Sequence, residues 1–152
     1  MGVVSIKSNL VTDRINNIQN ADPELVRGRP IVATGTVANS AADSATSTYH
    51  LVDLPAHAIL DSRTAFDVEN WGFATVSIGT LDDADALISV AKSSGNTVSP
   101  IAFGDANHGL ALWQVLGLAA EPASGVVSLY AHAPADATGA GSMPFEIHYR
   151  SR

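Results

Sequence analysis

The sequence predicts a mostly β fold, an antiparallel β-sandwich or jelly roll with one or two short inserted helices and an extended N-terminal arm. Three observations lead to this prediction. Short segments alternate apolar and polar residues or gather β-branched residues, and loops rich in Gly, Pro, Ser and Asn separate them. Strands and helices do not alternate as a parallel sheet would require. The length of 152 residues fits a single domain.

The first 30 residues are predicted to form the arm, and residues 31–152 to form the sandwich domain. Polar residues, Gly2 and Pro23 interrupt the arm, and its apolar residues come singly. A long segment of this kind is either disordered or ordered by a partner, and the sequence leaves both possibilities open.

Six segments are predicted to be strands. The clearest alternation lies in 143–150, where Met143, Phe145, Ile147 and Tyr149 are expected to face the core. The segment 57–68 is predicted as one strand or a bent pair, and the loop 134–142 before the last strand suits a hairpin or a flexible tip. The predicted strands are 31–37, 48–54, 57–68, 73–81, 126–133 and 143–150.

Two segments are predicted to be helices. In 80–96, three aspartates precede apolar residues at helical spacing, and Gly95 suits the end of a helix. In 108–122, Leu110, Trp113 and Leu116 are expected to share one face, after an N-cap at Asn107. This second helix is interpreted either as a lid on one end of the sandwich or as a subunit interface.

The balance of charge limits the classes of partner. The chain has a net charge of −7, and its basic residues gather near both ends while residues 31–149 are acidic. Nucleic acid is therefore not expected as a partner, because phosphate binding needs clustered Lys and Arg. Charged residues make up 15% of the chain, fewer than the usual ~25%, so much of the surface is neutral and suits packing against protein.

Membranes and exported compartments are not expected either. No apolar run approaches the ~20 residues that span a bilayer, and the first 14 residues do not resemble a signal peptide. The chain has no cysteine, which excludes disulfides and thiolate chemistry. We therefore expect synthesis in the cytoplasm.

No catalytic residue, metal ligand or cofactor is predicted, and the chain is not expected to be an enzyme. The histidines do not stand at the spacing of metal ligands within one helix or strand. The carboxylates of residues 82–85 fit the N-terminus of a helix, and no Gly-x-Ser-x-Gly motif is present.

Several stretches resemble the small virion structural proteins of tailed bacteriophages, of the head decoration (cement) type. They are 4-VSIKSNLVTDR-14, 48-TYHLVDLPAHAIL-60, 73-FATVSIGTL-81, 112-LWQVLGLAAEP-122 and the strand-rich 126–150. The resemblance implies a β-sandwich or jelly roll, often trimeric, on the outside of the head shell. It implies the major capsid protein and further copies of the chain as partners, with assembly in the cytoplasm of the bacterial host.

The residues expected to contact a partner are chosen by polarity and position. They are Ile6, Lys7, Leu10, Ile15, Arg27, Arg29 and Trp71. The alternative function is a phage tail or host-binding module with a receptor- or sugar-binding surface, for which Trp71 is the candidate aromatic residue.

Overall fold

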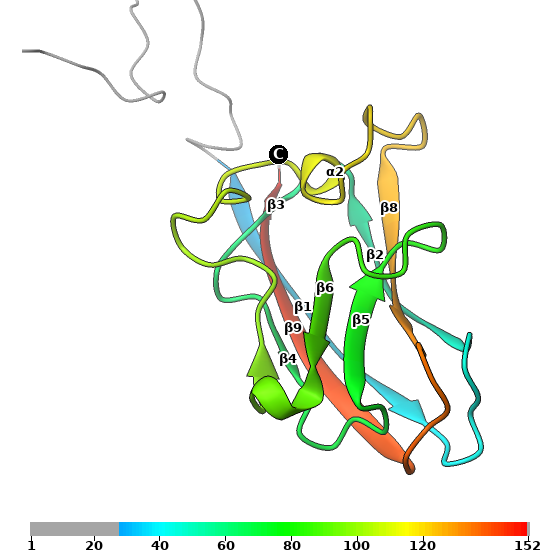
Figure 1. Cartoon of the computed structure of the whole chain (residues 1–152). Coiled ribbons are helices and arrows are strands. Elements are labelled where there is room, and N and C mark those ends of the chain that lie inside the picture. Colours follow the sequence, from blue (N-terminus) through cyan, green and yellow to red (C-terminus); the bar gives the residue numbers. More distant parts are fainter. Residues whose placement is uncertain (1–27, 152) are drawn as a thin grey trace, which may run out of the picture.

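The computed structural model describes residues 28–151, which form two antiparallel sheets packed face to face (Figure 1). The predicted β-sandwich is confirmed. The first sheet runs, in spatial order, through β1 (Arg29–Asn39), β9 (Gly141–Ser151), β4 (Ala65–Asp67) and β7 (Thr97–Val98), and β3 (Ile59–Leu60) also pairs with β9. The second runs through β2 (Thr48–Pro55), β8 (Val126–His132), β5 (Thr75–Gly79) and β6 (Ile88–Ala91).

The longest ladder joins β1 to β9. It extends without a register shift from Arg29 opposite Ser151 to Asn39 opposite Gly141. Because side chains alternate across a strand, Met143, Phe145 and Ile147 are buried in the core as predicted. The strand begins at Arg29, so the last two residues of the predicted arm belong to β1.

Aromatic residues fill the core near the middle of the chain. Trp71 is 0% exposed, and its ring centroid lies 5.3 Å from that of Tyr49 and 5.3 Å from that of Phe73. The Tyr49 hydroxyl donates a hydrogen bond to Asp43 at 2.6 Å. Burial and this hydrogen bond raise the pKa of Tyr49 to about 12.

The predicted helix at 80–96 is wrong. Residues 88–91 form the edge strand β6, which pairs with β5 from Ile78 opposite Ile88 to Thr75 opposite Ala91. A loop precedes β6, and a short 3₁₀ turn, Lys92–Ser94, follows it. In the loop, the Thr80 amide donates to the carbonyl of Asp83 at 2.8 Å. The backbone there passes so close to Gly79 that a Cβ atom on that residue would lie 2.1 Å from the same carbonyl oxygen.

The second predicted helix is present but contains only α2 (Leu112–Val115). Its N-cap is Ala111 and not Asn107, and the amide of Leu112 donates to the Ala58 carbonyl at 2.7 Å. Because the helix begins at Leu112, the buried residues are Leu112, Val115 and Leu116. The predicted face of Leu110, Trp113 and Leu116 is therefore wrong, since Leu110 is 36% exposed and Trp113 is half-buried.

The sandwich has two different ends. At the α2 end, α2 lies beside β3 and the start of β1, because Ile59 bridges to Ala111 and pairs with Arg150 (Figure 1). At the opposite end, which we call the loop-junction end, the loops 40–47, 69–74 and 133–140 meet. The last of these crosses from β8 in one sheet to β9 in the other, so the predicted hairpin is wrong.

Candidate interaction surface

The predicted contact residues fall into three groups. Ile6, Lys7, Leu10, Ile15 and Arg27 lie outside the described residues. Arg29 is exposed at the start of β1. Trp71 is completely buried between the sheets, so its interpretation as a surface contact or a sugar platform is wrong for the folded chain.

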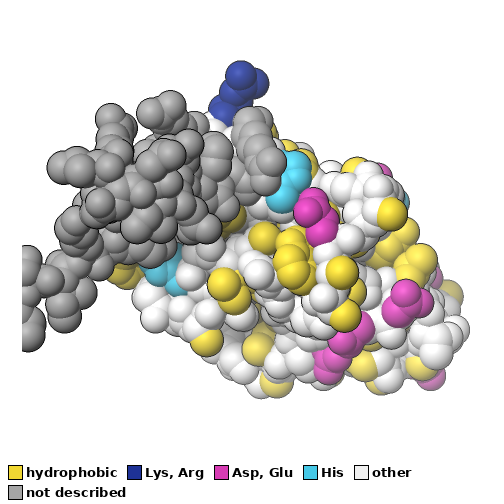
Figure 2. Space-filling view, turned by 90° about the horizontal axis from the view of Figure 1, so that it is seen from above, with side chains coloured by type: hydrophobic (Ala, Val, Ile, Leu, Met, Phe, Trp, Pro, Cys, Tyr) yellow, Lys and Arg dark blue, Asp and Glu magenta, His cyan; other side chains and the backbone are white. Residues whose placement is uncertain are grey.

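Of the residues expected in a helix or interface, Leu116 belongs to the core and Leu110 and Trp113 reach the surface at the α2 end. Figure 2 looks down on this end. Hydrophobic side chains are spread over it and carboxylates line one side, whereas Lys and Arg are scarce among the described atoms. The charge and polarity of this end suit a protein partner.

The most exposed aromatic residue of the described chain is Phe103, at 84%. It lies in the loop between β7 and α2, which buried Ile101 anchors to the core. The sequence analysis did not identify it. The sequence did contain a signal for it. The stretch 102-AFGDANHG-109 has the Gly, Asp and Asn residues of a loop and no strand alternation, which indicates that its aromatic residue lies in a loop.

Hydrogen bonds hold the Phe103 loop in one shape. The Asp105 carboxylate accepts from the amide of Ala102 at 2.8 Å and from that of Asn107 at 2.9 Å. These bonds, chiefly the one from Ala102, lower the pKa of Asp105. The Gly104 amide donates to His108 Nδ1 at 3.1 Å, and the rings of Phe103 and His108 lie 4.8 Å apart. Phe103 is thus presented from an ordered backbone, which reduces the entropy lost on binding.

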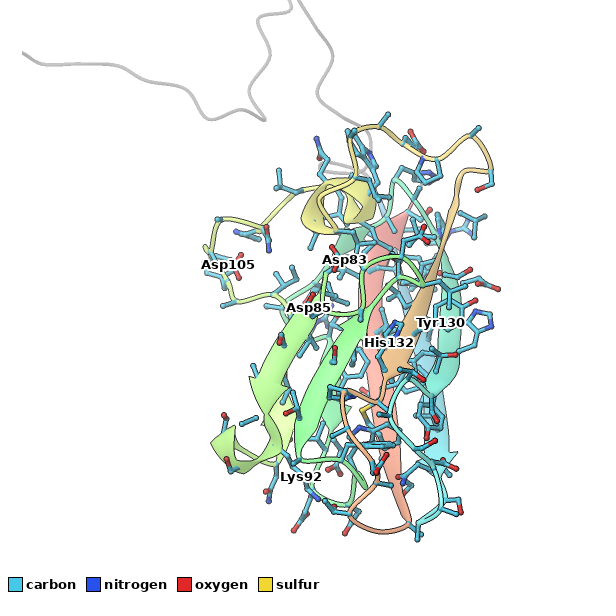
Figure 3. All side chains as sticks on the ribbon, turned by 45° about the vertical axis from the view of Figure 1, so that its right-hand side comes forward. Asp83, Asp85, Lys92, Asp105, Tyr130 and His132 are labelled. Atoms are coloured by element: carbon cyan, nitrogen blue, oxygen red, sulfur yellow. The ribbon has the colours of Figure 1, made fainter. Side chains whose placement is uncertain are left out.

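A groove of about 410 Å³ lies on the other side of α2, against the outer face of β8. Leu81, Leu116, Leu118, Pro122, Val126 and Tyr130 supply its apolar lining, and Asp82 and Asp83 supply its charges. Figure 3 places Tyr130 on β8 and Asp83 in the loop between β5 and β6, and no residue of the Phe103 loop lines the groove. The groove and the Phe103 loop are therefore separate features.

Beside the groove, three polar side chains contact one another across β2 and β8. Asp53 Oδ1 accepts from Ser128 Oγ at 2.5 Å and lies 2.8 Å from His50 Nε2. The hydrogen bond from Ser128, and then that from His50, lower the pKa of Asp53. The His50 ring stacks on Tyr130 at 4.7 Å.

This cluster does not have the order of a nucleophilic triad. In a Ser-His-Asp triad, the histidine lies between the other two so that it can take the proton from serine. Here the carboxylate is central, and Ser128 donates to it directly. The arrangement ties β2 to β8 at the surface, and the histidine contacts Asp53 instead of Ser128.

The aspartates of residues 82–85 lie in the loop before β6, so their predicted place at the N-terminus of a helix is wrong. The amide of Asp83 donates to Thr80 Oγ1 at 3.1 Å, and His132 Nε2 lies 2.8 Å from the Thr80 carbonyl oxygen. Across residues 28–151, no three His, Asp or Glu side chains converge as a metal site would need. Nor does this part of the chain contain a helix long and apolar enough to cross a membrane.

No protein-family model, curated protein or solved structure matches this chain. The resemblance to phage decoration proteins therefore stays a prediction.

Proposed function

We propose that this chain is a bacteriophage capsid decoration (cement) protein that binds the outside of the head shell and stabilises contacts between major capsid protein subunits. The observation that carries the proposal is Phe103, which is 84% exposed on a hydrogen-bonded loop at the α2 end of the sandwich. An ordered, exposed aromatic residue is the kind of anchor that dominates protein interfaces. The stretches that resemble decoration proteins supply the class of partner.

The point at which β1 begins supports the same proposal. β1 begins at Arg29, opposite Ser151, at the end that also carries α2 (Figure 1). The chain therefore enters the sandwich at the α2 end, which also carries the Phe103 loop. Two contacts attached to one body reinforce each other through their effective concentration, so a shell-bound subunit gains affinity from both.

The scarcity of charge also favours a shell-bound protein. Because only 15% of the residues are charged, covering a broad surface of the chain costs little free energy of desolvation. At the α2 end, His57 Nδ1 lies 3.8 Å from Glu121, and Phe103, Leu110 and the half-buried Trp113 supply apolar contacts. We expect this end to face the shell.

The test uses heads of the phage that encodes the chain, prepared from a strain in which its gene is deleted. Purified chain is added, and bound chain is measured by co-sedimentation and by the temperature at which the heads release DNA. We expect the added chain to bind and to raise this temperature. Failure of the wild-type chain to bind these heads would rule out the decoration role.

Two variants identify the contacting surface. Phe103→Ala is expected to weaken binding by about tenfold or more, because anchors of this type contribute more than their neighbours. Leu81→Ala is the matched control, because it truncates an exposed apolar side chain outside the Phe103 loop, in the groove, and it should bind like wild type. Deletion of residues 1–20 is also expected to lower occupancy, and unchanged occupancy would contradict a role for the arm.

A second candidate, a tail or host-binding module, is favoured by the groove against β8. Although Trp71 is buried, Tyr130 lines this groove and offers an aromatic ring stacked on His50. If the groove binds a host receptor, Tyr130→Ala lowers adsorption of phage to cells and leaves head stability unchanged. The decoration function instead predicts that Phe103→Ala lowers head stability and leaves adsorption of phage to cells unchanged.

A further inference from the structure

Among residues 28–151, no strand pairs with the outer edge of β1. β1 lies at the end of its sheet and pairs with β9 on one side only. Within residues 28–151, no backbone group of β1 hydrogen-bonds to any element other than β9. An edge strand of 11 residues thus presents a row of unpaired amide and carbonyl groups.

The other three edges of the sandwich are limited in ways that β1 is not. β7 has 2 residues and β6 has 4, which leaves little to pair with. β2 has a register shift between His50 and Val52 and ends at Pro55. Bulges, prolines and short strands are the usual means of preventing edge-to-edge association.

β1 lacks these protective features along most of its length. Its ladder with β9 has no register shift, its only proline is Pro30 at the start, and no charged residue lies between Arg29 and Asn39. The strand 31-IVATGTVA-38 is rich in β-branched residues, which favour sheet pairing. Val32 is 52% exposed on its outer face.

The inner row of β1 is incompletely covered. Ile31, Ala33 and Val37 are only half-buried, whereas Met143, Phe145 and Ile147 of the neighbouring β9 are buried. A further strand beside β1 would continue the apolar row and cover these side chains. The edge therefore offers both main-chain hydrogen bonds and apolar area to a partner strand.

We infer that the partner is a second copy of this chain, joined by antiparallel pairing of β1 with β1 across a two-fold axis. Two-fold pairing places a strand against itself, which is unfavourable when it carries charges and acceptable when it is neutral. With Gly35 on the axis, Thr34 lies opposite Thr36 of the other copy. β1 is therefore compatible with itself as a partner.

Charge complementarity at the ends of the paired strands supports this partner. In the same register, Arg29 of one copy extends past the end of the other copy's β1, toward the turn that contains Asp43. Asp43 carries a carboxylate held in this turn by the Ser40 amide at 2.9 Å. The two-fold axis brings Arg29 of each copy toward this turn of the other copy. The inferred assembly is a dimer, in contrast to the trimer that the resemblance favours, and it does not depend on the proposed function.

The test places charges on the outer face of β1 in the full chain. Thr34→Lys with Thr36→Lys, and Thr34→Glu with Thr36→Glu, each bring like charges together across the axis. Sedimentation velocity should show a dimer for wild type and association weakened by about tenfold or more in each double variant. Mixing the two double variants should restore the dimer, because Lys then faces Glu.

The matched control puts Lys at Ser89 and Ala91, two exposed positions on the edge strand β6, and should leave the dimer intact. Amide exchange of the wild-type chain gives a second measurement that needs no variant. Amides of β1 should become more protected as concentration rises. A monomeric or trimeric wild type, dimers that persist in both double variants, or protection of β1 that does not vary with concentration would overturn the inference.

Discussion

The two ends of the sandwich are built differently. At the loop-junction end, backbone groups of the loops bond to one another and to β9: the Thr138 amide donates to the Gly72 carbonyl at 2.8 Å, and the Ser142 amide of β9 donates to the Asn70 carbonyl at 3.0 Å. At the α2 end, the Phe103 loop bonds mainly within itself and presents its aromatic ring to solvent. The first end joins distant parts of the chain, and the second presents a surface.

We therefore expect residues at the loop-junction end to stabilise the fold and exposed residues at the α2 end to bind a partner. Side chains at the loop-junction end connect segments far apart in sequence, so their removal is expected to destabilise the fold. Side chains exposed at the α2 end contact few other groups, so their removal should change binding without changing the free energy of unfolding. The following substitutions test that separation.

The largest effect is expected from Trp71→Ala, near the loop-junction end. The ring is fully buried against Tyr49 and Phe73, and its removal leaves a cavity, so we expect a loss of about 3–5 kcal/mol in the free energy of unfolding. Urea denaturation followed by circular dichroism measures it. The matched aromatic change, Phe103→Ala, should stay within about 0.5 kcal/mol of wild type. Equal losses for both variants would contradict the separation of the two ends.

Asn39→Ala should have the next largest effect. The buried Asn39 side chain donates to the Gly139 carbonyl at 2.8 Å and accepts from the Gly72 amide at 3.1 Å, so it joins two loops to the end of β1. Alanine leaves both backbone groups without a partner, which costs about 1–3 kcal/mol. Asn107→Ala, in the Phe103 loop, is the control. A thermal unfolding midpoint for Asn39→Ala equal to that of this control would show that the bonds contribute little.

Trp113→Ala at the α2 end is expected to cost less than Trp71→Ala. The Trp113 ring is half-buried against the core cluster, so its removal loses part of the transfer free energy and leaves no closed cavity. We expect a loss of about 1–2 kcal/mol, measured by the same urea denaturation. A loss as large as that for Trp71→Ala would mean that α2 is as important for stability as the centre of the core.

The strands were predictable because their signal is local. In 143–150, inward and outward residues alternate without interruption, and β9 follows that alternation through Met143, Phe145 and Ile147. The prediction of a helix at 80–96 failed because a contact with another strand, and not the local pattern, decides the structure there. Ala84, Leu87, Ile88 and Ala91 match helical spacing, yet pairing with β5 determines the conformation of residues 88–91.

The candidate surface was less predictable than the fold. Sequence polarity does not distinguish a Trp at the centre of a core from one on a loop, and 69-ENWGF-73 has the composition of a turn although Trp71 is buried. Exposure of Phe103 depends on where Ile101 and Asp105 anchor its loop. These contacts form only after the chain has folded, so spacing along the sequence does not encode them directly.

The smallest effect is expected from the Asp105 carboxylate, which acts on one loop only. Backbone hydrogen bonds, chiefly from Ala102, hold the pKa of Asp105 below its ordinary value of 3.8. The contribution of this group to loop order is therefore complete above that value and is lost as the pH falls through the lower pKa of the folded chain. Acidification should broaden the NMR amide signals of residues 102–108 before those of β9.

Asp105→Asn should produce the same local change at neutral pH, because an amide accepts fewer hydrogen bonds than a carboxylate. Asp85→Asn is the control, since no hydrogen bond involves the Asp85 carboxylate within the described part of the chain. If Asp105→Asn also lowers the affinity for heads while the unfolding midpoint stays constant, the order of the loop contributes to binding through Phe103. An unchanged affinity would mean that the ring binds equally well from a disordered loop, and preorganisation would then have no part in recognition.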